Sequence, residues 1–224
     1  MRGLVNRLRT SVGALNFLYR ISGFLNFFGR RFDRAKNRAM RAAAALPQGY
    51  LNGQNLQPLA ALPYGAYTVG WCGCEAIAVY NALLTLGKAQ PFDEVAAELE
   101  KRGLLLNGLG GTHLAAARRY LERFASDTNL LGAKRASEYD AAFAGSKTAL
   151  LAYWTGAKLK NTDGSWNMLH TVALVHAPDG GVTVYNAYGG SERPAYAVSV
   201  AAFLAEREYL PVMLCTAAEI PVDK

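Results

Sequence analysis

The chain has 224 residues, of which 51% are hydrophobic, and a formal net charge of +7. This length fits one generous domain, or one domain with an appendage. Residues 1–41 hold ten Lys/Arg and one acidic residue, a net charge of +9, whereas the other 183 residues hold 14 basic and 16 acidic groups, a net charge of −2. Because the positive charge is confined to the N-terminal segment, we expect no nucleic-acid partner for the rest of the chain.

Cysteine content and the N-terminal residues bear on the compartment. Three cysteines, Cys72, Cys74 and Cys215, are too few for a disulfide framework and favour a reducing compartment. Arg20 and Arg30 interrupt the apolar stretches near the N-terminus, so the sequence predicts neither a signal peptide nor a membrane-spanning helix there. We therefore expect a cytoplasmic location, with association with a membrane surface as an alternative.

Residues 1–45 are expected to form a basic amphipathic helical segment ahead of a main domain at 46–224. Apolar residues recur at steps of three and four, and Gly13, Gly23 and Gly29 break the predicted helix into shorter pieces. This segment suits packing on the domain or on a partner chain, binding to an anionic membrane, or service as a pro-segment. The apolar stripe consists of Leu4, Leu8, Val12, Leu15, Leu18, Ile21, Leu25, Phe28 and Phe32.

An irregular connector and three helices come next. Residues 46–70 are rich in Gly, Pro and Asn, which predicts a connector that crosses the surface. One helix is predicted over 74–87, where Gly87 ends it, and a second over 91–103. A glycine turn precedes a third helix within 108–124, for which Thr112 is the expected N-cap.

Strand patterns dominate the C-terminal part of the chain. A short helix is also predicted there, over 200–208. Helices followed by antiparallel strands are the order of an α+β fold, with a helical N-terminal lobe packed on an antiparallel β-sheet lobe. Runs of β-branched and aromatic residues predict strands at 147–154, 170–177, 181–188 and 209–215.

Of the three histidines, His170 is the best candidate for catalysis. His113 lies in the first turn of a helix, where a solvated or capping role is expected, and His176 lies at the far end of a strand. A hairpin turn centred on residue 178 would pair His170 with Asn186, with Cβ atoms about 5 Å apart. An amide at that distance can accept the ring N–H and select the tautomer. A simple turn role for Asn186 is the alternative.

The cysteines of the Cys72-Gly73-Cys74 sequence allow several interpretations. A zinc site needs two further ligands, a redox pair lacks the usual βαβ surroundings, and two inert buried cysteines remain an alternative. A nucleophile is favoured because a helix N-terminus and a nearby imidazolium both stabilise a thiolate. Cys74 is the better candidate, since it begins the predicted helix and its backbone N–H can face a developing oxyanion. We expect no metal and no cofactor.

Two stretches, CGCEAIAVYNALLTLG (72–87) and LHTVALVHAPDGGVTVYNAYGG (169–190), resemble the papain-like cysteine peptidases. Within that superfamily they are most similar to the bacteriocin-processing (double-glycine leader) peptidase branch. In those proteins a Cys opens a helix that ends at a Gly about thirteen residues later, and an Asp or Asn follows the catalytic His by about sixteen. Cys74 and Gly87 have this spacing, and so do His170 and Asn186. GLGGTHLAAARRYL (108–121) is similar to the middle helical segment of these relatives, and the resemblance covers about residues 62–215.

The resemblance implies a thiol hydrolase that acts on a peptide or protein substrate. Its triad would be Cys74 as nucleophile, His170 as general base and acid, and Asn186 as the orienting residue. Papain-like enzymes usually carry a Gln six residues before the Cys as an oxyanion donor, and here that position is Thr68. Gln54, Gln57 or a backbone N–H are the alternative donors. An inactive peptide-binding or regulatory module, or an acyltransferase with the same triad, is the alternative function.

Overall fold

The structure, a computed structural model, describes residues 10–11, 13–14, 17, 20–156 and 167–219. It combines helices with an antiparallel sheet, which confirms the predicted α+β class. The helices are α3 (Ser22–Phe27), α4 (Arg34–Ala42), α5 (Val69–Cys72), α6 (Cys74–Thr85), α7 (Phe92–Arg102), α8 (Leu114–Leu121), α9 (Tyr139–Ala144) and α10 (Val200–Glu206), with 3-10 turns η1 (Leu59–Ala61), η2 (Leu106–Gly108) and η3 (Ala133–Glu138). The strands are β1 (Pro63–Tyr64), β2 (Tyr67–Thr68), β3 (Asp127–Gly132), β4 (Thr148–Trp154), β5 (Leu169–His176), β6 (Val182–Tyr185), β7 (Ala195–Ala197) and β8 (Leu210–Ala218).

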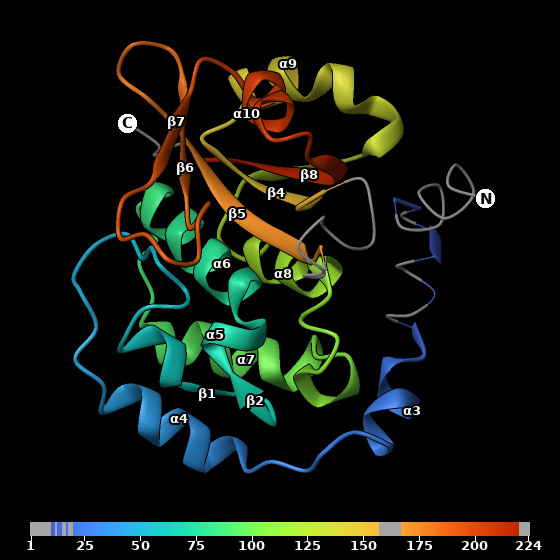
Figure 1. The fold of residues 1–224 in the computed structure, drawn as a ribbon, viewed down its shortest axis with the longest axis vertical. Helices are drawn as coiled ribbons and strands as arrows, with labels where there is room; N and C mark the ends of the chain where they lie inside the picture. The colour runs from blue at the N-terminus through green and yellow to red at the C-terminus, as the bar shows by residue number, and fades with distance from the viewer. Residues whose placement is uncertain (1–9, 12, 15–16, 18–19, 157–166, 220–224) are drawn as a thin grey trace.

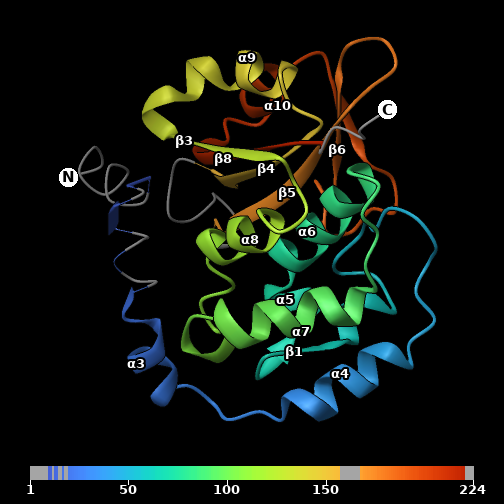
Figure 2. The same cartoon turned by 180° about the vertical axis from the view of Figure 1, so that it is seen from behind.

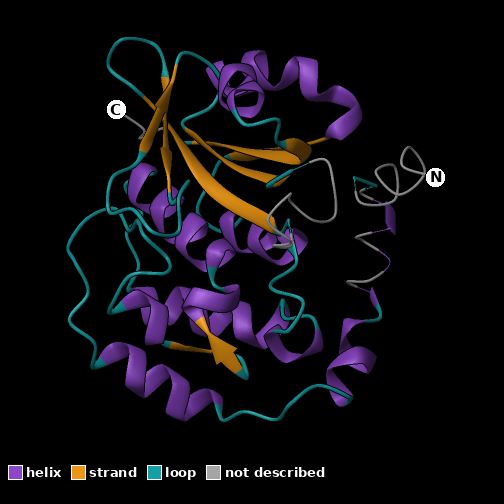
Figure 3. Ribbon diagram, viewed as in Figure 1, coloured by secondary structure: helices purple, strands orange, loops and turns teal. Residues whose placement is uncertain are grey.

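The main sheet has six strands in the order β3-β8-β4-β5-β6-β7, and every neighbouring pair is antiparallel. Figure 1 shows α9 and α10 on one face of this sheet and α6 and α8 on the other. The view from behind in Figure 2 shows the same layers, with α5 and α7 beyond α6 and with α4 outermost. The small β1–β2 hairpin lies among these lower helices (Figure 3). In the described part of the chain, no helix is long and apolar enough to cross a bilayer.

The sheet separates two hydrophobic cores, because the side chains of a strand alternate between its faces. On β5, Ala173 belongs to the core beneath the sheet, whereas Val172 and Leu174 belong to the core above it. The lower core is filled largely by α6, which is apolar on nearly all sides and is therefore the central helix of the domain. The upper core is closed by α9 and α10.

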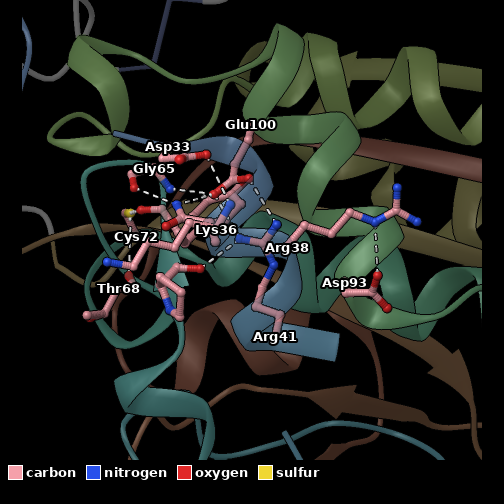
Figure 4. Close-up of polar contacts among 12 residues, drawn as sticks. Asp33, Lys36, Arg38, Arg41, Gly65, Thr68, Cys72, Asp93 and Glu100 are labelled. Atoms are coloured by element: carbon pink, nitrogen blue, oxygen red, sulfur yellow. Dashed lines mark hydrogen bonds and ion pairs between the residues drawn. The ribbon is translucent and has the colours of Figure 1, made fainter. Parts of the chain in front are cut away.

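Helix α4 is bound to the domain by a buried ion pair (Figure 4). Arg41 donates from Nη1 and Nη2 to the two carboxylate oxygens of Glu100 at 2.8 and 2.9 Å, and neither side chain is exposed. Pro63 contributes a carbonyl acceptor for Arg41, while Asn37 and the backbone N–H of Gly65 donate to Glu100. This bidentate geometry offsets part of the cost of removing two charges from water.

The boundary expected at residue 45 follows α4, which the ion pair joins to the main fold. Arg38 adds two exposed contacts, to Asp93 and Glu94 at the start of α7. The described residues of the predicted stripe do not share one environment: Phe32 packs on the lower core, whereas Phe28 is exposed. The stripe positions Leu4, Leu8, Val12, Leu15 and Leu18 lie outside the described residues.

Three local predictions differ from the structure. Neither β3, an edge strand with polar residues at its start, nor the short helix α9 is predicted from the sequence. His113, not Thr112, is the N-cap of α8: its Nδ1 accepts from the N–H of Ala115 at 3.0 Å. The Thr112 hydroxyl instead pairs with the Tyr64 hydroxyl at 2.6 Å, so tertiary packing removes it from the capping position.

Candidate functional site

Cys74 is the first residue of α6, as the sequence predicts, and Gly73 is its N-cap. Its N–H therefore has no partner within that helix. The thiol is buried and lies against β5, where the backbone N–H of Thr171 donates toward the sulfur. Since Thr171 directly follows His170, the fold brings the predicted nucleophile and the predicted base, 96 residues apart, to the same part of β5.

The Cys74 thiol has Glu75 as its hydrogen-bond acceptor, a residue that is not among the predicted site residues. The Cys74 Sγ–H donates to Glu75 Oε2 at 3.0 Å, and the Thr171 hydroxyl donates to Glu75 Oε1 at 3.3 Å. The backbone N–H groups of Glu75 and Thr112 also donate to this carboxylate. One buried side chain thus joins α6, β5 and the Gly-Gly-Thr turn around the thiol. A lone acidic residue in an otherwise apolar helix is the sequence feature that points to a buried carboxylate here.

Burial changes the proton affinities of this pair. It raises the pKa of Glu75 to about 7, although four hydrogen-bond donors counteract part of that effect. The pKa of the Cys74 thiol is raised well above its usual value, first by burial and then by the adjacent Glu75 carboxylate. The Thr171 N–H acts in the opposite direction, because it favours the thiolate. With Glu75 ionised, Cys74 is therefore held as a neutral thiol.

His170 is oriented by a short hydrogen bond at the end of β6. Its Nε2 lies 2.6 Å from the backbone carbonyl oxygen of Asn186. A carbonyl only accepts, so Nε2 carries the proton and Nδ1 of the neutral ring carries the lone pair. The ring packs edge-on against Tyr153 with centroids 5.8 Å apart. Burial lowers the pKa of His170, which keeps the ring neutral, and the bond to Asn186 partly opposes this effect.

The predicted role of the Asn186 side chain is wrong, because its backbone carbonyl makes the contact with His170. The hairpin is centred on residue 179, since His176 pairs with Val182, so each β5 residue pairs two positions further along β6 than predicted. Asn186 lies beyond β6 with φ of +62°, a left-handed conformation that Asn tolerates. This turn directs its carbonyl at the imidazole and its side chain away from it.

The Asn186 side chain binds the connector before β1. Its Oδ1 accepts from the backbone N–H of Gln54 at 3.1 Å, and its Nδ2 donates to Gln54 Oε1 at 3.2 Å. Gln54 Nε2 donates to the carbonyl of Gly70, just before the cysteine pair. The expectation of a surface connector is therefore wrong here: Leu51 and Gln54 are buried, and the segment braces the site.

These contacts also bear on the oxyanion donor. The side-chain amide of Gln54 is engaged with Gly70 and Asn186, and Gln57 is exposed.

Within the described residues, no hydrogen bond joins the Cys74 thiol to the His170 ring. On β5 the side chains of His170 and Thr171 point to opposite faces, and the sulfur lies at the backbone N–H of Thr171. The His170 ring packs on Tyr153 of the upper core, whereas the thiol and the Thr171 hydroxyl meet at Glu75 on the α6 side of the sheet.

Cys72 and Cys215 do not share this site. The Cys72 thiol lies in the lower core, 3.5 Å from the Thr68 carbonyl, and burial raises its pKa to about 12. Cys215 is buried in β8 with a similarly raised pKa, and all three cysteines are free. Over the described ranges, no three His, Cys, Asp or Glu residues are grouped to hold a metal ion. His176 lies at the strand end, as predicted, and bonds the Ser146 carbonyl.

In comparisons with known proteins, no family model, no curated protein and no solved structure matches the chain.

Proposed function

We propose that the chain is a papain-like cysteine peptidase or amidase with Cys74 as nucleophile and His170 as base. One observation carries this proposal: a thiol at the N-terminus of α6, the helix that packs on β5, lies in the same part of the fold as a histidine of β5 whose ring is fixed by the carbonyl of Asn186. A helix N-terminus, a backbone donor and a neighbouring imidazole are the groups that stabilise a thiolate. The order and spacing of these residues agree with the resemblance found in the sequence.

The reaction would begin when the thiol turns from Glu75 toward Nδ1 of His170. His170 takes the thiol proton as the sulfur attacks the substrate carbonyl, and the Cys74 N–H is one donor to the oxyanion. The protonated ring then gives its proton to the leaving amine, which leaves an acyl group on the sulfur. Water, deprotonated by the same ring, releases the acid and restores the thiol. An amine in place of this water would make the chain an acyltransferase.

A second candidate function is a peptide-binding or regulatory module without turnover. The observation in its favour is the pairing of the thiol with Glu75 and not with His170. That pairing raises the pKa of Cys74, whereas catalysis requires a thiolate. The substitution of Thr68 for the Gln of papain-like enzymes favours the same alternative.

Hydrolysis of a fluorogenic peptidyl-amide library by the full chain separates the two functions. The proposal expects turnover that Cys74→Ser and His170→Ala abolish, while Cys72→Ser retains most of it. All variants should keep the circular dichroism spectrum of the parent. Equal loss from Cys72→Ser and Cys74→Ser would refute the assignment. Peptide binding without turnover, unaffected by Cys74→Ser, would establish the second function.

A further inference from the structure

The N-terminal helix α3 presents an aromatic surface to solvent. Phe24, Phe27 and Phe28 are 68, 77 and 66% exposed, and Phe17 is 61% exposed. The rings of Phe24 and Phe28 meet edge to face at 5.1 Å, and those of Phe27 and Phe28 at 5.4 Å. We call Phe24, Phe27 and Phe28 the aromatic patch. A group of large exposed apolar side chains usually marks an interaction site.

The attachment of α3 to the domain determines which side faces outward. Asn26 donates from its side chain to the carbonyl of Leu104 and accepts from the N–H of Asn107, both at 2.8 Å. Asn107 donates in return to the backbone carbonyls of Asn26 and Arg30. Asn26 is two residues from both Phe24 and Phe28, which corresponds to nearly opposite sides of a helix. The bound side of α3 therefore leaves the aromatic patch facing solvent.

Gly29 makes this attachment close. A Cβ at Gly29 would lie 2.7 Å from a backbone atom of Leu106, so only glycine lets the chain approach η2 at this point. Figures 1 and 2 show α3 at the outer edge of the molecule, apart from the main sheet. The orientation of the patch is thus a built feature of the domain surface.

Exposed arginines lie on both sides of the aromatic patch in the sequence. Arg20, Arg30 and Arg31 are exposed, and neither Arg20 nor Arg31 forms an ion pair with another residue of the described chain. Residues 1–41 carry ten Lys/Arg and one acidic residue. A second copy would bring the same positive charge to this surface and be repelled. Phosphate groups above an apolar layer complement both the arginines and the phenylalanines.

We propose that α3 and the adjoining arginines dock the protein on an anionic membrane surface, with the aromatic patch inserted among the headgroups. This proposal is independent of the catalytic one. It assigns one of the alternatives that the sequence left open for residues 1–45. The site on β5 would then work beside a lipid surface.

Cosedimentation of the full chain with vesicles tests the proposal. The chain should bind vesicles of phosphatidylglycerol and phosphatidylcholine, and bind pure phosphatidylcholine vesicles at least about tenfold more weakly, because several Arg contribute. Phe27→Ser should weaken binding about tenfold, whereas Val198→Ser, which removes a 72% exposed side chain elsewhere, should not change it. Arg31→Glu should weaken binding several-fold and Arg193→Glu should not.

Three results would overturn the proposal. The first is absence of binding to anionic vesicles, and the second is an equal effect of Phe27→Ser and Val198→Ser on that binding. The third is a concentration-dependent dimer in sedimentation velocity that Phe27→Ser dissolves, without vesicle binding, which would make the patch an interface between copies. Peptidyl-amide turnover by the same preparations is read separately, so the failure of one proposal is not mistaken for failure of the other.

Discussion

Replacing Glu75 by Gln should make the Cys74 thiol more reactive, although Gln cannot accept the thiol proton as a base. The structure gives the reason: the carboxylate oxygen is 3.0 Å from the sulfur and would repel a thiolate. With an effective dielectric constant of about 20, the Coulomb repulsion between the carboxylate and a thiolate at that distance is roughly 5.5 kcal/mol. It is roughly 3 kcal/mol if the two charges move to about 5 Å apart. The pKa of Cys74 should therefore fall by about two to four units.

The reactivity gain is smaller than the pKa change. Each unit by which the pKa of the thiol falls makes the thiolate about tenfold more abundant at a pH below that pKa. A less basic thiolate is also a weaker nucleophile, which removes about half of this gain on a logarithmic scale. Glu75→Gln should thus be alkylated by iodoacetamide at least about tenfold faster than the parent at pH 8. Because the pKa of Glu75 is about 7, its carboxylate is protonated in the parent at lower pH. The rate ratio should therefore rise through pH 7 and approach one near about pH 5.5.

Mass spectrometry of the Cys74 peptide, with time points across pH, measures this rate without interference from Cys72 or Cys215. Glu94→Gln, at an exposed carboxylate, is the matched control and should leave the rate unchanged. Slower alkylation of Glu75→Gln at pH 8, with the thermal melting curve retained, would refute the reasoning. It would show that Glu75 activates the thiol.

Three further predictions concern the supports of the site. Asn186→Gly keeps the carbonyl and the left-handed backbone, so ¹⁵N NMR should still show His170 protonated at Nε2, while two lost buried hydrogen bonds lower the unfolding free energy by about 1–3 kcal/mol. A change of tautomer would mean that the side chain orients the ring. Removal of residues 1–45 should lower the free energy of unfolding in urea by about 3–5 kcal/mol more than removal of residues 1–32, because only the longer deletion leaves Glu100 buried without Arg41. Equal stabilities of the two truncated chains would contradict this account. In an NMR titration the His170 midpoint should lie below 6.5, since burial disfavours the imidazolium, and a midpoint above it would contradict that burial.

Local patterns in the sequence were enough to predict the central elements of the fold. Helix α6 begins at Cys74, and β4 has the predicted bounds to within one residue. The start of α6 follows a glycine, and β4 is a continuous apolar run, so each is encoded by neighbouring residues. The α+β class follows from the order of such segments. The capping alternative for His113 is confirmed for the same reason, because a helix N-terminus is a local feature.

Contacts between distant segments were decided only by the tertiary structure. A Glu in the first turn of a helix ordinarily faces solvent and favours the helix dipole. Here β5 and the Gly-Gly-Thr turn cover Glu75, which gives it a raised pKa and the thiol as a neighbour. Likewise, Asn186 lies beyond β6 in a left-handed conformation, so its backbone, not its side chain, is the partner of His170. Periodicity identifies which residues face a neighbour, but the identity of that neighbour depends on packing across the whole domain.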